Sequence, residues 1–157
     1  MQDDVTLFID APTADVWALV SDVTRIGEFS PETFEAEWLD GATGPEVGAR
    51  FRGHVKRNGK GPTYWSTCVV EVCEPEQEFT FGVLVNGKVI NTWGYRLQAA
   101  GDGTNVTEYF ELANTMANRA YWYLMGALRG KANRNGMRAT LEAMKQVLEA
   151  EPASPDA

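Results

Sequence analysis

The sequence predicts an α+β fold in which a curved, seven-stranded antiparallel sheet wraps around a long C-terminal helix. Over residues 34–113, strand-like apolar runs recur at roughly ten-residue spacing and are separated by Gly, Pro, Asn and Asp. Residues 115–150 then have the propensity and the period of a helix. One face of such a sheet must be buried, and this helix is the only long element left to cover it. We therefore expect an internal pocket between the two.

The N-terminal segment is expected to form the first strand and two short helices. Residues 3–9 alternate apolar and polar side chains, as a half-buried strand does. Asp10 is a favourable N-cap and Pro12 a favourable first-turn residue for the helix that follows. A second short helix spans residues 22–29. It must end before Pro31, because the residue preceding a proline avoids the helical conformation.

Six further strands are expected after the short helices, each bounded by turn residues. They are residues 34–40, 48–57, 63–73, 77–85, 88–98 and 104–113. The pair Asn86-Gly87 lies between two apolar runs and is typical of a two-residue hairpin turn. All six strands can therefore follow one another as antiparallel neighbours.

The C-terminal helix presents a small surface in its first half. The apolar stripe that contains Met137 and Leu141 projects back onto Gly126 and Gly130, which Trp122 flanks. Glycine in a helix costs up to ~1 kcal/mol relative to alanine, so these positions indicate a kink, a close backbone contact or space for a ligand. A helix of this length also exceeds the width of a small domain, so we expect a bend or an overhang.

Length, charge and chemistry-bearing residues exclude several classes of function. The 157 residues suit one domain, expected at 1–150 and followed by a disordered tail at 151–157. A net charge of −8 disfavours nucleic acid and anionic membrane surfaces as partners. No stretch approaches the ~20 apolar residues of a membrane span, and no basic leader is present. We expect a soluble, cytoplasmic protein without stable membrane insertion.

Few side chains could bind a metal or form a covalent intermediate. His54 is the only histidine, and Cys68 and Cys73 are the only cysteines. They provide neither a metal-ligand set nor a disulfide framework, and the sequence has no glycine-rich phosphate loop. His54 lies in a basic stretch typical of an exposed strand and turn, which disfavours a nucleophilic site built on it. We expect no cofactor and no metal.

Motifs along almost the whole chain are similar to those of one known superfamily. They include Ala11-Pro12, Val16-Trp17, Ser21-Asp22-Val23, Ser30-Pro31-Glu32 and residues 47–53, 68–75, 92–97, 103–111 and 136–149. The sequence thus resembles polyketide cyclase/dehydrase-like proteins of the START/Bet v 1-like (SRPBCC) superfamily. The resemblance implies a helix-grip fold with a hydrophobic cavity between the sheet and the C-terminal helix. It also implies ligands such as lipids, polyketides, sterols or other aromatic or isoprenoid compounds, but it identifies no catalytic residue.

Strand alternation indicates which side chains line the expected pocket. In 88–98, Trp93 and Tyr95 share the face with most of the apolar side chains, so this face should point inward. Two alternations remain open in 63–73, and we favour the one that does not bury Glu71. The favoured alternation turns inward Tyr64, Ser66, Cys68, Val70 and Val72. The expected ligand-binding residues are Tyr64, Phe81, Trp93, Tyr95, Phe110, Trp122, Gly126 and Gly130.

Glu108 is the candidate catalytic residue. Val106 and Phe110 flank it on the same strand face, so its carboxyl group should enter the interior. A carboxyl group buried without a cation has a raised pKa and can act as a general acid or base. The commoner alternative is a structural role, for example in an ion pair with Arg96, Arg119 or Arg134.

Three functions remain open from the sequence. We favour a binding module for a hydrophobic small molecule, followed by a polyketide cyclase, aromatase or dehydratase that uses Glu108 in the same cavity. Tyr95, Tyr64 or His54 could assist such an enzyme. The third is a protein-interaction domain with a collapsed pocket. Basic clusters at 50–60 and 119–138 are most simply solvated surface, with a rim attracting an anionic ligand as the alternative. A homodimer could form through Tyr121, Leu124, Met125 and Leu128.

Overall fold

The computed structural model describes residues 2–57, 61–113 and 116–150, and the side chains of these residues except those of 116–130. Its elements are β1 (Gln2–Ile9), α1 (Thr13–Ser21), η1 (Val23–Glu28), β2 (Thr33–Trp38), β3 (Arg50–Val55), β4 (Tyr64–Glu74), β5 (Glu78–Val85), β6 (Lys88–Ala100), β7 (Gly103–Leu112) and α2 (Met116–Ala150). The prediction of one strand, two short helices, six strands and a long helix is confirmed.

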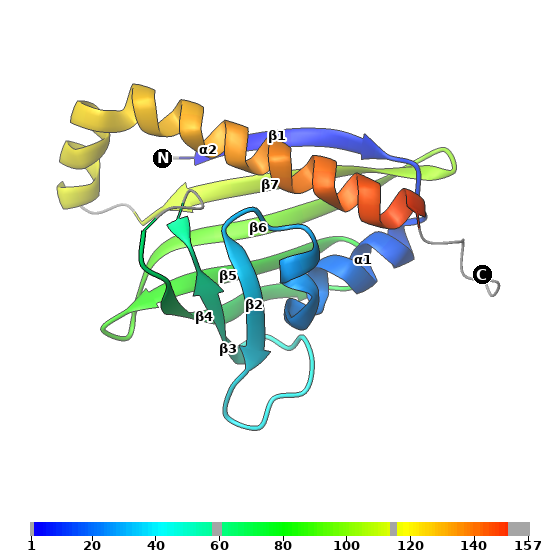
Figure 1. Ribbon diagram of the computed structural model, residues 1–157, viewed down its shortest axis with the longest axis horizontal. Helices are drawn as coiled ribbons and strands as arrows, with labels where there is room; N and C mark the ends of the chain where they lie inside the picture. Colours follow the sequence, from blue (N-terminus) through cyan, green and yellow to red (C-terminus); the bar gives the residue numbers. More distant parts are fainter. Residues whose placement is uncertain (1, 58–60, 114–115, 151–157) are drawn as a thin grey trace.

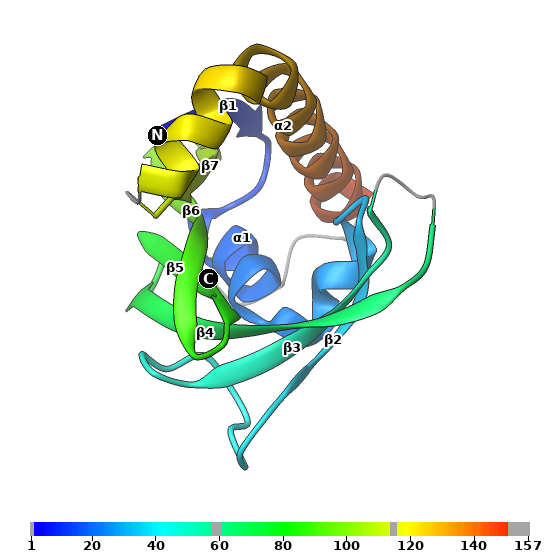
Figure 2. The ribbon, with the colours of Figure 1, turned by 90° about the vertical axis from the view of Figure 1, so that its left-hand side faces the viewer.

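The seven strands form one antiparallel sheet in the order β1-β7-β6-β5-β4-β3-β2 (Figure 1). From β2 to β7, consecutive strands pair with each other, and β1 pairs with β7 at one edge of the sheet. Viewed from one end, the sheet curves around α1 and α2 (Figure 2). The first turns of α2 are bent away from the axis of the rest of the helix (Figure 1), as its length predicts.

Three helices, and not α2 alone, cover the inner face of the sheet. Helix α2 packs mainly against β1, with further contacts to β7 and η1, whereas α1 packs against β6 and β7. Helix α1 can do so because Val16 and Leu19 form a fully buried stripe. In α2, Leu141 and Met144 are also fully buried. The expectation that the long helix is the sole cover of the sheet is therefore wrong.

A β-bulge interrupts the favoured alternation of β4. Cys68 and Val70 are buried, as that alternation predicts. The register then shifts between Val70 and Val72, and Cys73 pairs with Phe79 and packs against the core. The inward assignment of Val72 is wrong, because the extra residue of a bulge exchanges the two faces of the strand beyond it.

The outer face of the sheet also buries an aromatic side chain. Tyr109 on β7 covers Gly94 on β6, where a Cβ atom would lie 2.4 Å from Tyr109 Cζ. The Tyr109 hydroxyl donates a hydrogen bond to Glu78 Oε1 at 2.7 Å and bonds with Thr80 Oγ1 at 2.7 Å. The guanidinium carbon of Arg96 lies 4.2 Å from the centre of the Tyr109 ring. Gly94 is therefore required for the close approach of this ring.

Substitution of Gly94 by alanine is expected to destabilise the fold by about 1–3 kcal/mol. The new methyl group would displace the Tyr109 ring and with it both hydrogen bonds of the hydroxyl. Urea denaturation measures the loss in free energy of unfolding. Gly44→Ala is the matched control, since nothing lies within 4 Å of the position of its Cβ. Equal stabilities of the two variants would contradict this account of the outer face.

Candidate functional site

The inner faces of β6 and β7 bring four of the expected site residues together. Tyr95 pairs with Glu108, and Trp93 pairs with Phe110. The ring centres of Trp93 and Phe110 are 4.6 Å apart. On the other side of β6, Phe81 of β5 pairs with Trp93. A carboxyl group is thus placed on a largely aromatic surface.

Glu108 is buried, with 4% of its surface exposed. Its Oε1 accepts a hydrogen bond of 3.4 Å from the Tyr95 hydroxyl. Its Oε2 is also buried and has no hydrogen-bond partner. Buried polar atoms in proteins are nearly always hydrogen-bonded, so an unpartnered carboxyl oxygen calls for an explanation.

The expected ion pair of Glu108 is absent from the described part of the chain. Arg96 instead bonds with Glu78 through its Nε at 3.3 Å. Arg134 bonds with Asp3 at 3.0 Å. The third candidate, Arg119, lies outside the residues whose side chains are described. Among the described residues, no cation offsets the burial of this carboxyl group.

Burial raises the pKa of Glu108 from its ordinary value of 4.5 to about 8, and the hydroxyls of Tyr95 and Thr140 lower it in part. Thr140, on α2, lies beside this carboxyl group, but its hydroxyl donates its hydrogen bond to the Gly136 carbonyl at 3.1 Å and makes none with Oε2. Burial, followed by the charge of Glu108, also raises the pKa of Tyr95. At neutral pH Glu108 is therefore mostly protonated, and its carboxyl group can donate a hydrogen bond or a proton.

Two observations describe how the surroundings of this carboxyl group are packed. Gly136 precedes Thr140 by one helical turn, so both lie on the same side of α2. Apart from the chain neighbours of Gly136 and the backbone of its own helix, no heavy atom of the described residues lies within 4 Å of the position that a Gly136 Cβ would take. Along β6, Tyr95 and Leu97 are buried, whereas Trp93 is partly exposed. The core is thus packed beneath α1 and is less covered toward the start of β6.

Of the predicted ligand-binding residues, Phe81, Trp93, Tyr95 and Phe110 lie on the inner face around Glu108. Tyr64 does not belong to this buried group, because it begins β4 and is 47% exposed. Trp122, Gly126 and Gly130 lie outside the residues whose side chains are described, as does the proposed dimer patch of Tyr121, Leu124, Met125 and Leu128.

Sequence reasoning missed Thr140 on α2 and Asn91, which lies on the same inner face of β6 two residues before Trp93. Asn91 has the same strand parity as Trp93 and Tyr95, so extending the alternation by one step would have found it. Nothing in the sequence alone shows which turn of the long helix lies opposite Glu108. Thr140 could therefore be found only from the packed structure.

Comparison with known proteins identifies the family. Residues 4–149 match the family described as polyketide cyclase / dehydrase and lipid transport. The chain belongs to this family. The resemblance inferred from the motifs is thereby confirmed, as is the helix-grip fold.

Solved structures agree with membership of the polyketide cyclase/dehydrase family. A polyketide cyclase-like protein from Corynebacterium glutamicum is 32% identical, with 94% of this chain and 91% of that chain covered and a TM-score of 0.62. A protein from Mesorhizobium loti is 16% identical over 97% of this chain and 99% of its own, with a TM-score of 0.68. The latter likeness shows the fold alone. No protein of curated function matches the sequence.

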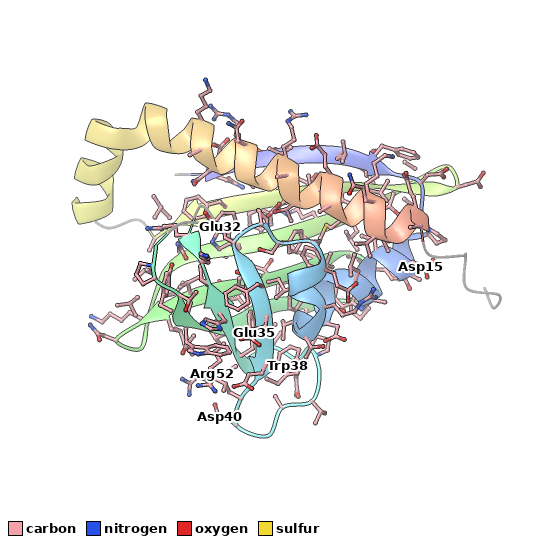
Figure 3. All side chains as sticks on the ribbon, in the orientation of Figure 1. Asp15, Glu32, Glu35, Trp38, Asp40 and Arg52 are labelled. Atoms are coloured by element: carbon pink, nitrogen blue, oxygen red, sulfur yellow. The ribbon has the colours of Figure 1, made fainter. Side chains whose placement is uncertain are left out.

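His54 of this polyketide cyclase/dehydrase-like chain lies on the outer face, apart from Glu108. Its Nδ1 is 2.6 Å from Glu35 Oε1, and its ring stacks on Trp65 with centres 4.4 Å apart. Figure 3 shows Glu35 on β2 and Arg52 on β3. Three strands lie between β3 and β7, and four between β2 and β7. His54 therefore cannot assist Glu108 directly.

Part of each basic cluster is neutralised by neighbouring carboxylates. Arg50 pairs with Asp40 at 3.2 Å, and Arg52 pairs with Glu37. Lys60, Arg119 and Arg129 lie outside the described side chains.

In the described part of the chain, no helix is long and apolar enough to cross a membrane. Nor do three His, Cys, Asp or Glu side chains gather there as metal ligands.

Proposed function

We propose that this protein binds a hydrophobic small molecule between the inner face of the sheet and α2. The ligand is a lipid, a polyketide or another aromatic or isoprenoid compound, and the carboxyl group of Glu108 is its polar contact. The buried, unpartnered Oε2 of Glu108, on the strand position opposite Tyr95, is the observation that carries this proposal. The family description, which includes lipid transport, supports the same ligand class.

The chemistry of the surroundings favours an apolar ligand that carries at least one oxygen. Leaving a polar group buried without a hydrogen bond costs about 1–3 kcal/mol, which a ligand oxygen could recover. Because Oε1 already accepts from Tyr95, the carboxyl proton is available on Oε2 for a ligand carbonyl or hydroxyl. Trp93 and Phe110 offer flat apolar surfaces to the body of such a ligand.

Flavone, which has one carbonyl and no ionisable group, is a suitable probe for isothermal titration calorimetry. The wild type is expected to bind it at pH 7, and Glu108→Leu to bind it about tenfold more weakly, because the hydrogen bond is lost. Wild-type affinity should also fall as the pH rises through about 8 and the carboxyl group loses its proton. Glu108→Gln keeps a donor that does not titrate, so its affinity should not change with pH.

The matched control is Glu111→Leu, which places the same substitution at an exposed position of the same strand. Its affinity for flavone should equal that of the wild type. The proposal would be wrong if the wild type did not bind flavone, or if Glu108→Leu and Glu111→Leu bound it equally well.

A dehydratase or cyclase is the second candidate function. It is favoured by the pKa of Glu108, about 8, which lets the group give and take a proton near neutral pH. In a dehydration, the protonated carboxyl group would give its proton to a leaving hydroxyl, which departs as water. The carboxylate would then take the proton from the adjacent carbon and return to its first state. Glu108→Gln separates the two functions, because glutamine keeps the hydrogen bond but has no proton to transfer.

A further inference from the structure

Among the described residues, a second buried polar atom also lacks a hydrogen-bond partner: Oδ1 of Asn91. Asn91 pairs with Val83 of β5 on one side and with Leu112 of β7 on the other. It has the same parity on β6 as Trp93 and Tyr95, so its side chain belongs to the inner face. Both unpartnered oxygens, Asn91 Oδ1 and Glu108 Oε2, are therefore on the inner face of the sheet.

The aromatic pair of Trp93 and Phe110 lies between these two polar atoms. Asn91 precedes Tyr95 by four residues, and Tyr95 is directly opposite Glu108. At about 3.3 Å per residue, the two polar positions are about 13 Å apart along the strand. The inner face thus presents a polar atom, an apolar aromatic stretch and a second polar atom, in that order.

We propose, on the basis of the function proposed above, that the ligand is an elongated, largely aromatic molecule with a hydroxyl or similar oxygen at each end. One end contacts Glu108, the other contacts Asn91, and the apolar body lies against Trp93 and Phe110. A hydroxyl suits both positions, because it can donate to the amide oxygen of Asn91 and accept from the carboxyl group of Glu108.

This ligand class differs from a single-headed lipid. A fatty acid has polar atoms at one end only, so it would leave either Asn91 or Glu108 unpartnered. A buried polar group without a partner weakens binding relative to a ligand that satisfies it. The site should therefore discriminate ligands by the polar group at their second end.

Three stilbenes test the proposal directly: trans-stilbene, 4-hydroxystilbene and 4,4′-dihydroxystilbene. They share one apolar body and differ in having no, one or two terminal hydroxyls. We expect calorimetry of the full-length wild type at pH 7 to show about tenfold tighter binding of the dihydroxy compound than of the monohydroxy compound. This comparison requires no variant, so it does not depend on whether a substitution disturbs folding.

Asn91→Leu is expected to remove the tenfold preference for the second hydroxyl. Asn105→Leu is the matched control, because Asn105 lies on β7 with the opposite parity to Glu108 and so faces the other side of the sheet. It should keep the preference. Persistence of the preference in Asn91→Leu would overturn the role of Asn91.

The outcomes separate this inference from the function on which it rests. If the wild type binds the monohydroxy and dihydroxy compounds equally well, a hydrophobic ligand still binds but the two-ended ligand class is wrong. If flavone binds but none of the three stilbenes does, the two-ended ligand class alone is overturned; if flavone also fails to bind, the hydrophobic site is overturned with it.

Discussion

Replacing Glu108 by glutamine is expected to stabilise the protein at alkaline pH, and to change its stability little at pH 4. The pKa of Glu108 is about 8 in the folded protein and near 4.5 when the group is in water. Between these values the unfolded chain releases the proton while the folded protein keeps it. The free energy of unfolding of the wild type therefore falls as the pH rises from 4.5 to 8.

The two pKa values differ by 8 − 4.5 = 3.5. At about 1.36 kcal/mol for each pKa unit, ionising Glu108 in the folded protein costs at most about 5 kcal/mol. Glu108→Gln avoids this cost, because glutamine is nearly isosteric with the protonated carboxyl group and cannot ionise. Urea denaturation from pH 4 to pH 9 measures the difference between wild type and variant.

Glu111→Gln is the control for this pH series, since Glu111 is exposed on the same strand. Its stability should follow the wild-type curve throughout. If the free energies of unfolding of the wild type and Glu108→Gln differed by the same amount at every pH from 4 to 9, Glu108 would not hold a proton in the folded state above pH 4.5.

Replacing Phe79 by alanine is expected to lower the free energy of unfolding by about 3–5 kcal/mol. Phe79 is 0% exposed and lies edge-on to Trp17 of α1, with ring centres 6.3 Å apart. Its removal would leave a cavity where α1 packs on the sheet. Differential scanning calorimetry or urea denaturation measures the loss.

The matched control for the core is Phe34→Ala on β2. Phe34 is 47% exposed, so its truncation should cost less than about 1 kcal/mol. Similar losses for the two alanine variants would mean that Phe79 does not anchor α1 to the sheet.

The sequence predicted the strands well where local signals define them. The Asn86-Gly87 turn joins β5 and β6 as expected, and both turn residues have positive φ angles. The bulge after Val70 was not predicted, because an extra residue in a strand leaves no clear mark on an alternating pattern. The role of α1 in covering the sheet was also missed, because the length of α2 made it the obvious cover.

The candidate site was predictable where it depends on strand parity. Because side chains alternate along a strand, the sequence alone placed Glu108, Tyr95 and Trp93 on one face. Parity does not fix how a helix is rotated and shifted over a sheet, so Thr140 was not foreseen. Tyr64 has the expected parity but lies exposed at the start of β4. The alternation of side chains shows which face of a strand a residue is on, but not whether another element covers it.

The most direct test of the central claim is a carbon-13 NMR titration of the Glu108 side-chain carboxyl group, with and without flavone. Without ligand, we expect the titration to have its midpoint near pH 8. Flavone should raise this midpoint, because its carbonyl binds the protonated carboxyl group and not the carboxylate. An ordinary midpoint near 4.5, or a midpoint that saturating flavone leaves unchanged, would contradict the assignment of Glu108 as the polar contact of a bound hydrophobic molecule.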